Sequence, residues 1–81
     1  MASTSELMQK PRLQEGERAI VIAIDGSMEF QNYLLANGIS LGTILTKNYS
    51  PSFARLINFS VGGKMMSLRV NDFELIEIVK I

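Results

Sequence analysis

The side chains in this sequence that could bind a metal ion are almost all carboxylates. The 81 residues include 8 Asp and Glu, but no histidine and no cysteine. Iron and similar metals usually recruit imidazole or thiolate ligands, and a hard cation needs several converging oxygen atoms. No spacing here would gather the carboxylates, so we predict no metal or cofactor site, with direct binding of a transition metal ion as the alternative. The carboxylates are Glu6, Glu15, Glu17, Asp25, Glu29, Asp72, Glu74 and Glu77.

Candidates for catalysis are equally sparse. Ser27, Ser40 and Ser50 have no histidine to activate them, so the sequence predicts no nucleophilic enzyme. Glu15 and Glu17 could be called a carboxylate pair, but at the start of a strand they indicate a solvated face. Glycines 62 and 63 lack the following helix of a phosphate-binding loop and indicate a hairpin turn. We therefore expect a protein that is not an enzyme.

The composition restricts the classes of partner. The chain is long enough for one small domain, and its 8 basic and 8 acidic residues cancel. A nucleic-acid-binding protein would normally show a basic face, so we expect no nucleic-acid partner. The longest apolar run, 19–24, is too short to cross a bilayer, and residues 1–6 show no signal pattern. These features predict a cytoplasmic protein without direct membrane insertion.

The hydrophobic pattern predicts a mostly β domain. Residues 1–12 are predicted to be a flexible tail, and residues 13–81 a single folded domain. Unbroken β-branched residues in the first strand suggest apolar neighbours on both faces, whereas later strands alternate. A single helical turn is expected at 71–73. The predicted strands are 17–24, 43–48, 55–61, 65–70 and 75–81.

One helix is predicted at 28–37, between the first two strands. Ser27 is a suitable N-cap, and Glu29 lies in the first turn, where a carboxylate favours the helix dipole. Asn37 and Gly38 are suited to end it. About five short strands and one short helix cannot cover both faces of an open sheet, so a small closed β-barrel is the expected fold.

Apolar residues expected to point outward suggest a surface for protein partners. If alternate residues from Ile57 face inward, then Leu56 faces out, and so does Met65 on the adjoining strand. Tyr49 and Phe53 flank the proline of the preceding loop. Such a cluster is typical of an interaction surface, although the two aromatic residues could instead cap the open end of a barrel.

The order and spacing of several residues resemble the ferrous-iron transport protein A (FeoA) family over about 13–81. The resemblance implies a Src-homology-3-like (SH3-like) β-barrel with an inserted helix. It also implies a cytoplasmic accessory protein of the large membrane GTPase-permease that imports ferrous iron (FeoB). The matching residues are Leu13-x-x-Gly16, Asp25-Gly26, Leu34-x-x-x-Gly38-Ile39-x-x-Gly42, Ser50-Pro51, Gly63 and Leu68-Arg69.

The sequence departs from the family pattern at three positions. Tyr33 stands where the family usually has arginine, Leu41 where it often has proline, and Phe73 where it usually has alanine. The first change alters both charge and hydrogen-bond geometry, so the partner surface is expected to differ from the typical one. The residues predicted to bind a partner are Tyr33, Leu41, Tyr49, Phe53, Leu56 and Met65.

Two other functions stay open at this point. The same module occurs at the C-terminus of iron-dependent repressors, so the chain could be a detached regulator module that binds a peptide or a subunit. No helix-turn-helix segment is visible, which favours the transporter role. A nucleic-acid-binding barrel is disfavoured by the neutral charge. Self-association through an edge strand also stays open.

Overall fold

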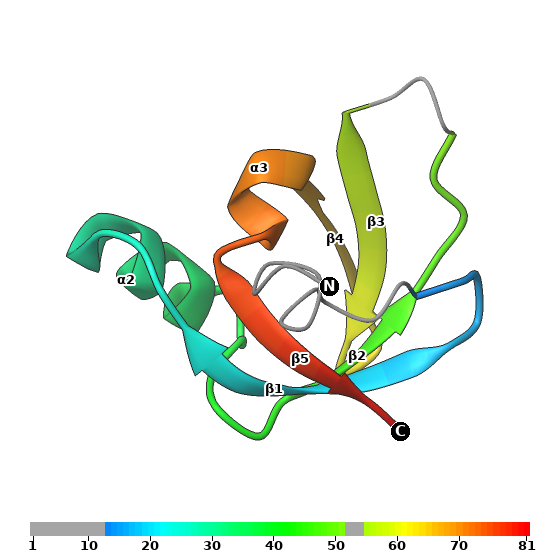
Figure 1. Cartoon of the computed structure of the whole chain (residues 1–81), viewed down its shortest axis with the longest axis horizontal. Coiled ribbons are helices and arrows are strands. Elements are labelled where there is room, and N and C mark those ends of the chain that lie inside the picture. The colour runs from blue at the N-terminus through cyan, green and yellow to red at the C-terminus, as the bar shows by residue number, and fades with distance from the viewer. Residues whose placement is uncertain (1–12, 52–54) are drawn as a thin grey trace, which may run out of the picture.

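The computed structural model of the chain describes residues 13–51 and 55–81, so the predicted tail at 1–12 and Phe53 lie outside the described residues. Within them, one antiparallel sheet has the strand order β4-β3-β2-β1-β5 (Figure 1). The mostly β prediction is confirmed. The elements are β1 (Arg18–Ile24), α2 (Met28–Ala36), β2 (Ile44–Lys47), β3 (Leu56–Val61), β4 (Lys64–Arg69), α3 (Val70–Phe73) and β5 (Ile76–Lys80).

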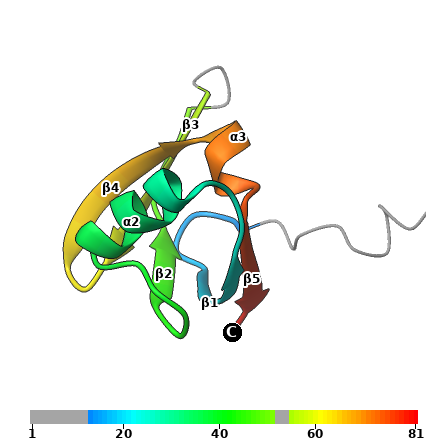
Figure 2. The same ribbon diagram turned by 90° about the vertical axis from the view of Figure 1, so that its left-hand side faces the viewer.

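The sheet curves strongly but does not close (Figures 1 and 2). Among the described residues, β4 pairs only with β3 and β5 pairs only with β1. The fold is SH3-like, as predicted. A closed barrel without free edges was expected, but among the described residues the sheet keeps two free edges, at β4 and at β5. The expected turn at 71–73 is the second helix, α3, and this short helix leads the chain from β4 to β5 instead of letting the two strands meet.

The core fills the concave side of the curved sheet. Phe59 of β3 and Phe73 of α3 both belong to it, with their ring centroids 6.0 Å apart. Phe73, one of the three departures from the family pattern, therefore contributes a large buried ring to the core. The buried residues are Ala19, Val21, Leu34, Ile39, Leu45, Phe59, Val61, Leu68, Phe73, Ile76 and Ile78.

The first strand differs from its prediction. Val21 is 1% exposed, but its neighbour Ile22 is 51% exposed, so apolar neighbours do not cover both faces. The pairing of β1 with β5 shifts register between Val21 and Ala23. Such a β-bulge inserts one residue into the ladder and re-aims side chains. Ile22 itself lies on the face of the strand opposite to that of Val21, as strand alternation requires.

Candidate docking surface

The C-terminus of α2 is closed by a Schellman motif. The amide of Gly38 donates to the carbonyl of Leu35 at 3.0 Å, and the amide of Ile39 donates to the carbonyl of Leu34 at 2.9 Å. Gly38 has a φ of 85°, which is the left-handed conformation this motif needs. Leu34 and Ile39 are both fully buried. The helix end is therefore pinned to the core by its own cap.

The next four residues form a turn that projects Leu41 from the surface. The amide of Thr43 donates to the carbonyl of Ser40 at 3.1 Å, and Gly42 at the third position has a φ of 89°. This is the pattern of a type II turn, whose second position favours proline. Leu41 occupies that second position and is 66% exposed. Leu41 therefore presents a large apolar side chain at the tip of the turn.

This turn, α2 and the end of β1 enclose a shallow depression of about 440 Å³, which we call the apolar groove. None of its lining residues is charged. Ile22, Met28, Leu35 and Leu41 are each at least half exposed there, although a folded domain normally covers such side chains. Its lining residues are Ile22, Ala23, Ile24, Met28, Gln31, Asn32, Leu35, Ile39, Ser40 and Leu41.

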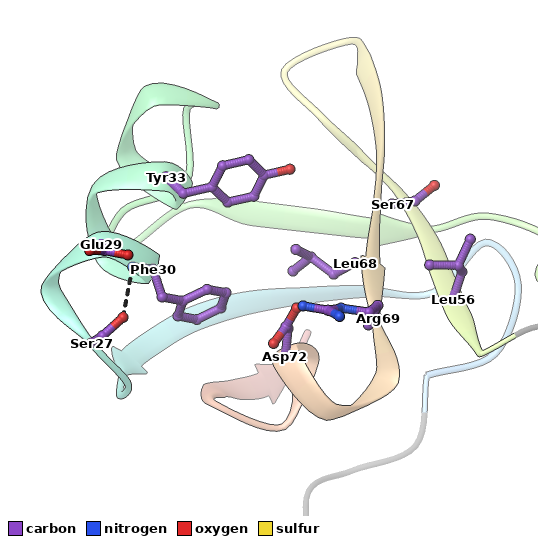
Figure 3. A pocket seen from close by; sticks show the side chains of 9 residues that line it. All are labelled: Ser27, Glu29, Phe30, Tyr33, Leu56, Ser67, Leu68, Arg69 and Asp72. Carbon is purple, nitrogen blue, oxygen red and sulfur yellow. Dashed lines mark hydrogen bonds and ion pairs between the residues drawn. The ribbon is translucent and has the colours of Figure 1, made fainter.

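A second depression, of about 500 Å³, lies between the opposite side of α2 and strand β4; we call it the acidic hollow (Figure 3). Phe30 and Leu68 point toward one another across it, and Tyr33 points from α2 toward β4. Ser27 begins the helix at this end, where its hydroxyl accepts the amide hydrogen of Phe30 at 3.1 Å. The predicted N-cap is confirmed. The lining residues are Ser27, Glu29, Phe30, Tyr33, Leu56, Ser67, Leu68, Arg69 and Asp72.

The acidic hollow carries an excess of negative charge. Arg69 forms an ion pair with Asp72, with 3.2 Å between Nε and Oδ2. Glu29 also lines the hollow, and it forms no ion pair within 13–51 and 55–81. Since the arginine is matched by one carboxylate, the carboxylate of Glu29 is left to attract a cationic group from outside.

Of the two carboxylates at the start of β1, Glu17 has structural contacts, although the sequence indicated a solvated face for both. Glu17 Oε1 accepts the amide hydrogen of Gln14 at 2.6 Å, and its Oε2 lies 3.0 Å from Nζ of Lys80. The hydrogen bond from Gln14, followed by the contact with Lys80, lowers the pKa of Glu17. Glu15 is exposed. The described part of the chain contains no group of three or more Asp, Glu, His or Cys able to hold a metal ion.

The residues predicted to bind a partner do not form one surface. Leu41 lines the apolar groove, whereas Tyr33 and Leu56 line the acidic hollow. Met65 is 72% exposed on β4, and Tyr49 is 67% exposed after β2. The outward orientation expected of Leu56 and Met65 agrees with their exposure. Whether any of these residues contacts a partner stays a prediction.

Sequence reasoning missed most of the apolar groove. Met28 and Leu35 lie one helical repeat of seven residues apart on α2, so a helical projection that also examined the face beside Leu34 could have grouped them. Ile22 was missed because apolar neighbours were expected on both faces of the first strand, although strand alternation places Ile22 on the face opposite to that of the buried Val21. The sequence feature that could have indicated the groove is the apolar pair on the face of α2 that does not pack against the core.

The fold is that of a small SH3-like domain whose surface carries the apolar groove and the acidic hollow. A family model described as the FeoA domain matches residues 11–80, and the chain belongs to this family. The family comprises small accessory domains and is not a known class of enzyme. A search of curated proteins gave no match. None of the helices within the described ranges has the length and apolar character needed to cross a membrane.

Solved structures show the same fold. A crystal structure of an iron uptake regulatory protein (FeoA) matches with a TM-score of 0.75 and 22% identity, covering 85% of this chain and 91% of that one. The zinc-bound structure of ScaR has a TM-score of 0.76 and 21% identity over 86% of this chain. The structure of a manganese-dependent transcriptional repressor with manganese matches with a TM-score of 0.75 and 21% identity, covering 84% of this chain. The match covers only about a third of the length of these two proteins, 34% of the ScaR chain and 33% of the repressor chain.

Proposed function

We propose that this protein is a non-enzymatic accessory domain of ferrous-iron uptake. It docks on the cytoplasmic side of an FeoB-type GTPase permease and modulates the activity of that permease. Membership of the FeoA family supports the iron-uptake context. The observation that carries docking is the apolar groove, in which Met28, Leu35 and Leu41 are exposed without a charged neighbour in the lining.

The energetics of the groove favour an apolar partner segment. Burying one exposed leucine or methionine side chain contributes about 1.5–3 kcal/mol. Several such side chains from one groove supply the buried centre that a docking interface needs, while the surrounding polar surface forms its rim. A charged partner residue in this groove would lose hydration without finding an opposite charge. The partner segment is therefore uncharged where it enters the groove.

The test is co-purification of the tagged protein with the full-length permease and, separately, with its soluble GTPase domain. Met28→Asp and Leu41→Asp each place a carboxylate in the groove at sites that tolerate it. Position 28 is the first residue of α2, where a negative charge favours the helix dipole, and position 41 lies in a turn. We expect each variant to weaken capture by about ten- to a hundredfold.

Two further variants make the result specific. Ile81→Asp adds the same charge at a side chain that is 64% exposed, nearly as much as Leu41, and outside the lining of the groove. It should bind like the parent protein. Met65→Asp tests the other predicted surface. Docking through the groove is wrong if Met65→Asp abolishes capture while Leu41→Asp does not, provided that circular dichroism shows all variants folded.

The likeness to the manganese-dependent transcriptional repressor supports a second candidate, a detached module of an iron-dependent transcriptional regulator that binds a peptide or another subunit. The same experiment separates the candidates. If folded protein is captured by neither form of the permease, the transporter role is contradicted. Recovery of a transcription-factor subunit in an unbiased pull-down that the groove variants abolish would then support the regulator role.

A further inference from the structure

The outer edge of β4 has no strand beside it. Among the described residues β4 pairs only with β3, and the two strands are joined by a hairpin in which Val61 lies opposite Lys64. The connecting residues, Gly62 and Gly63, both have positive φ angles of 55° and 80°. A two-residue turn of this kind is flanked by a residue pair that exchanges backbone hydrogen bonds, and such pairs then alternate along the ladder.

This alternation identifies the backbone groups on the free edge. The amide of Val70 donates to the carbonyl of Arg55 at 3.0 Å, in phase with the pair that flanks the turn. The even-numbered residues of β4 therefore direct their backbone groups toward β3. The amides of Met65, Ser67 and Arg69 and the carbonyls of Met65 and Ser67 point the other way, and no strand within the described ranges covers them. The carbonyl of Arg69 belongs to the N-cap of α3 and is used by that helix.

The acidic hollow lies along this free edge. Its walls are Phe30 and Tyr33 of α2 on one side and residues of β4 on the other, including Ser67 and Leu68 (Figure 3). An added strand would run about 4.8 Å from β4. Alternate side chains of that strand would point inward, in line with the buried Leu68 and toward the ring of Phe30. The edge and the aromatic wall together fit an extended chain.

Charge indicates the composition of that chain. Two carboxylates and one guanidinium line the hollow, and the guanidinium of Arg69 is paired with Asp72. Glu29 is left without an ion pair among the described residues. A lysine or arginine of an incoming segment would complement it, whereas an acidic segment would be repelled.

We propose that β4 accepts an extended, basic segment of a partner protein as an additional strand in the acidic hollow. Hydrogen bonds to the backbone of Met65 and Ser67 and to the amide of Arg69 hold the segment. Apolar side chains of the segment pack against Phe30, and a basic side chain faces Glu29. This is recognition by strand addition, in which the backbone contributes affinity and side-chain pockets contribute specificity. It is separate from the apolar groove and does not depend on the identity of the permease.

A second copy of this chain fits the edge less well. Pairing of two β4 edges about a two-fold axis would bring two acidic hollows together, each with the same excess negative charge. Like charges facing each other in this way oppose association. A basic peptide meets the same backbone groups without this repulsion.

The probe is a capped six-residue peptide of alternating lysine and valine, matched to the six residues of β4. It is titrated into ¹⁵N-labelled protein and followed by NMR. We expect the amide signals of Met65, Ser67 and Arg69 to shift and their hydrogen exchange to slow. Ser67→Pro removes an edge donor and should weaken binding by about five- to tenfold relative to Ser67→Ala, which loses the same hydroxyl but keeps the amide.

Three comparisons make the outcome decisive. A peptide with N-methyl groups at alternate positions keeps its side chains but loses edge hydrogen bonds, and it should not bind. A glutamate–valine peptide should bind more weakly than the lysine–valine peptide. The Glu29→Gln variant should show a smaller difference in affinity between these two peptides. The proposal is overturned if the N-methylated peptide binds equally, if the shifts fall only on the apolar groove, or if the edge signals change with protein concentration alone.

Discussion

The two sides of α2 present opposite chemistry to a partner. The apolar groove is lined by uncharged residues of α2, β1 and the turn at Leu41, whereas the acidic hollow combines the aromatic side chains of Phe30 and Tyr33 with three charged groups. Between these two faces of the helix, Leu34 points into the core and is fully buried. One helix of nine residues thus serves two surfaces because its positions divide by helical periodicity.

The difference suggests separate roles for the two surfaces. Apolar burial contributes most of the affinity of a typical interface but little orientation, whereas hydrogen bonds and charges fix register and discriminate between partners. In this domain the apolar groove would supply most of the affinity, and the β4 edge would fix the register of the partner and discriminate between partners. Both depend on the position of α2, which the first prediction tests directly.

The largest effect is expected from Leu34→Ala, because this residue holds the helix that both surfaces share. Truncating a fully buried leucine leaves a cavity and lowers the free energy of unfolding by about 2–5 kcal/mol. That is a large share of the roughly 5–15 kcal/mol typical of a domain. Urea denaturation should show a lower midpoint, and both permease capture and peptide binding should weaken together.

Leu35→Ala is the matched control, since it makes the same chemical change one residue later at a side chain that is 62% exposed. Its effect on unfolding should stay below about 1 kcal/mol, and its effect on binding should be confined to the apolar groove. If the two variants lose equal stability, Leu34 does not anchor the helix. If Leu34→Ala impairs one surface alone, the two surfaces do not share α2 as their support.

A smaller effect is expected from alanine at the glycines that flank α2. Gly26 and Gly38 have φ angles of 100° and 85°, so either substitution should cost about 1 kcal/mol in backbone strain. A Cβ at position 38 would meet no atom within 4 Å, but one at position 26 would lie 3.0 Å from a ring carbon of Phe30 and 3.1 Å from Leu75. Thermal unfolding should therefore show the greater loss for Gly26→Ala.

The variants Gly26→Ala and Gly38→Ala should also differ in peptide binding at the acidic hollow. Because Phe30 is a wall of the acidic hollow, displacement of its ring by Gly26→Ala should weaken binding of the lysine–valine peptide. Gly38→Ala should leave that binding unchanged. Equal peptide affinity for both variants would mean that Phe30 does not contact the added strand.

The strands and the helix could be predicted because their signals are local. Phe59 and Val61 alternate with polar neighbours and are buried as expected, and Ser27 caps α2 through its own hydroxyl. The glycine pair at 62 and 63 fixes the hairpin, since both residues adopt positive φ angles. Each of these features is decided by residues only a few positions apart in the sequence.

The surfaces could not be predicted in the same way, because they depend on contacts distant in sequence. The exposure of Ile22 depends on which elements pack against its face of β1, and the structure leaves that side chain 51% exposed. Tyr33 and Leu41 were both predicted to bind a partner, and the structure places Tyr33 in the lining of the acidic hollow and Leu41 in that of the apolar groove. The open edge of β4 likewise follows from α3, whose course no local pattern determines.

The smallest effect is expected at Glu17, which lies outside the lining of both hollows and ties the start of β1 to β5 through Lys80. Its pKa is lowered in the folded protein, chiefly by the hydrogen bond from the Gln14 amide and then by Lys80. A lowered folded-state pKa means that the unfolded chain binds the proton more tightly. The stabilisation is therefore complete above the unfolded value, about 4.3 for glutamate.

As the pH falls below that value and through the lower folded pKa, this stabilisation should be lost. Urea midpoints measured from pH 7 downward should therefore fall less steeply for Glu17→Gln than for the parent protein, because the variant has no carboxylate there to protonate. Glu15→Gln removes the same charge at an exposed neighbour and should follow the parent curve. Peptide binding and permease capture at pH 7 should be the same for both variants, since neither residue lines a hollow. A binding defect in Glu17→Gln would mean that the paired strands β1 and β5 also support docking. The apolar groove and the acidic hollow beside α2 would then not be the only binding surfaces.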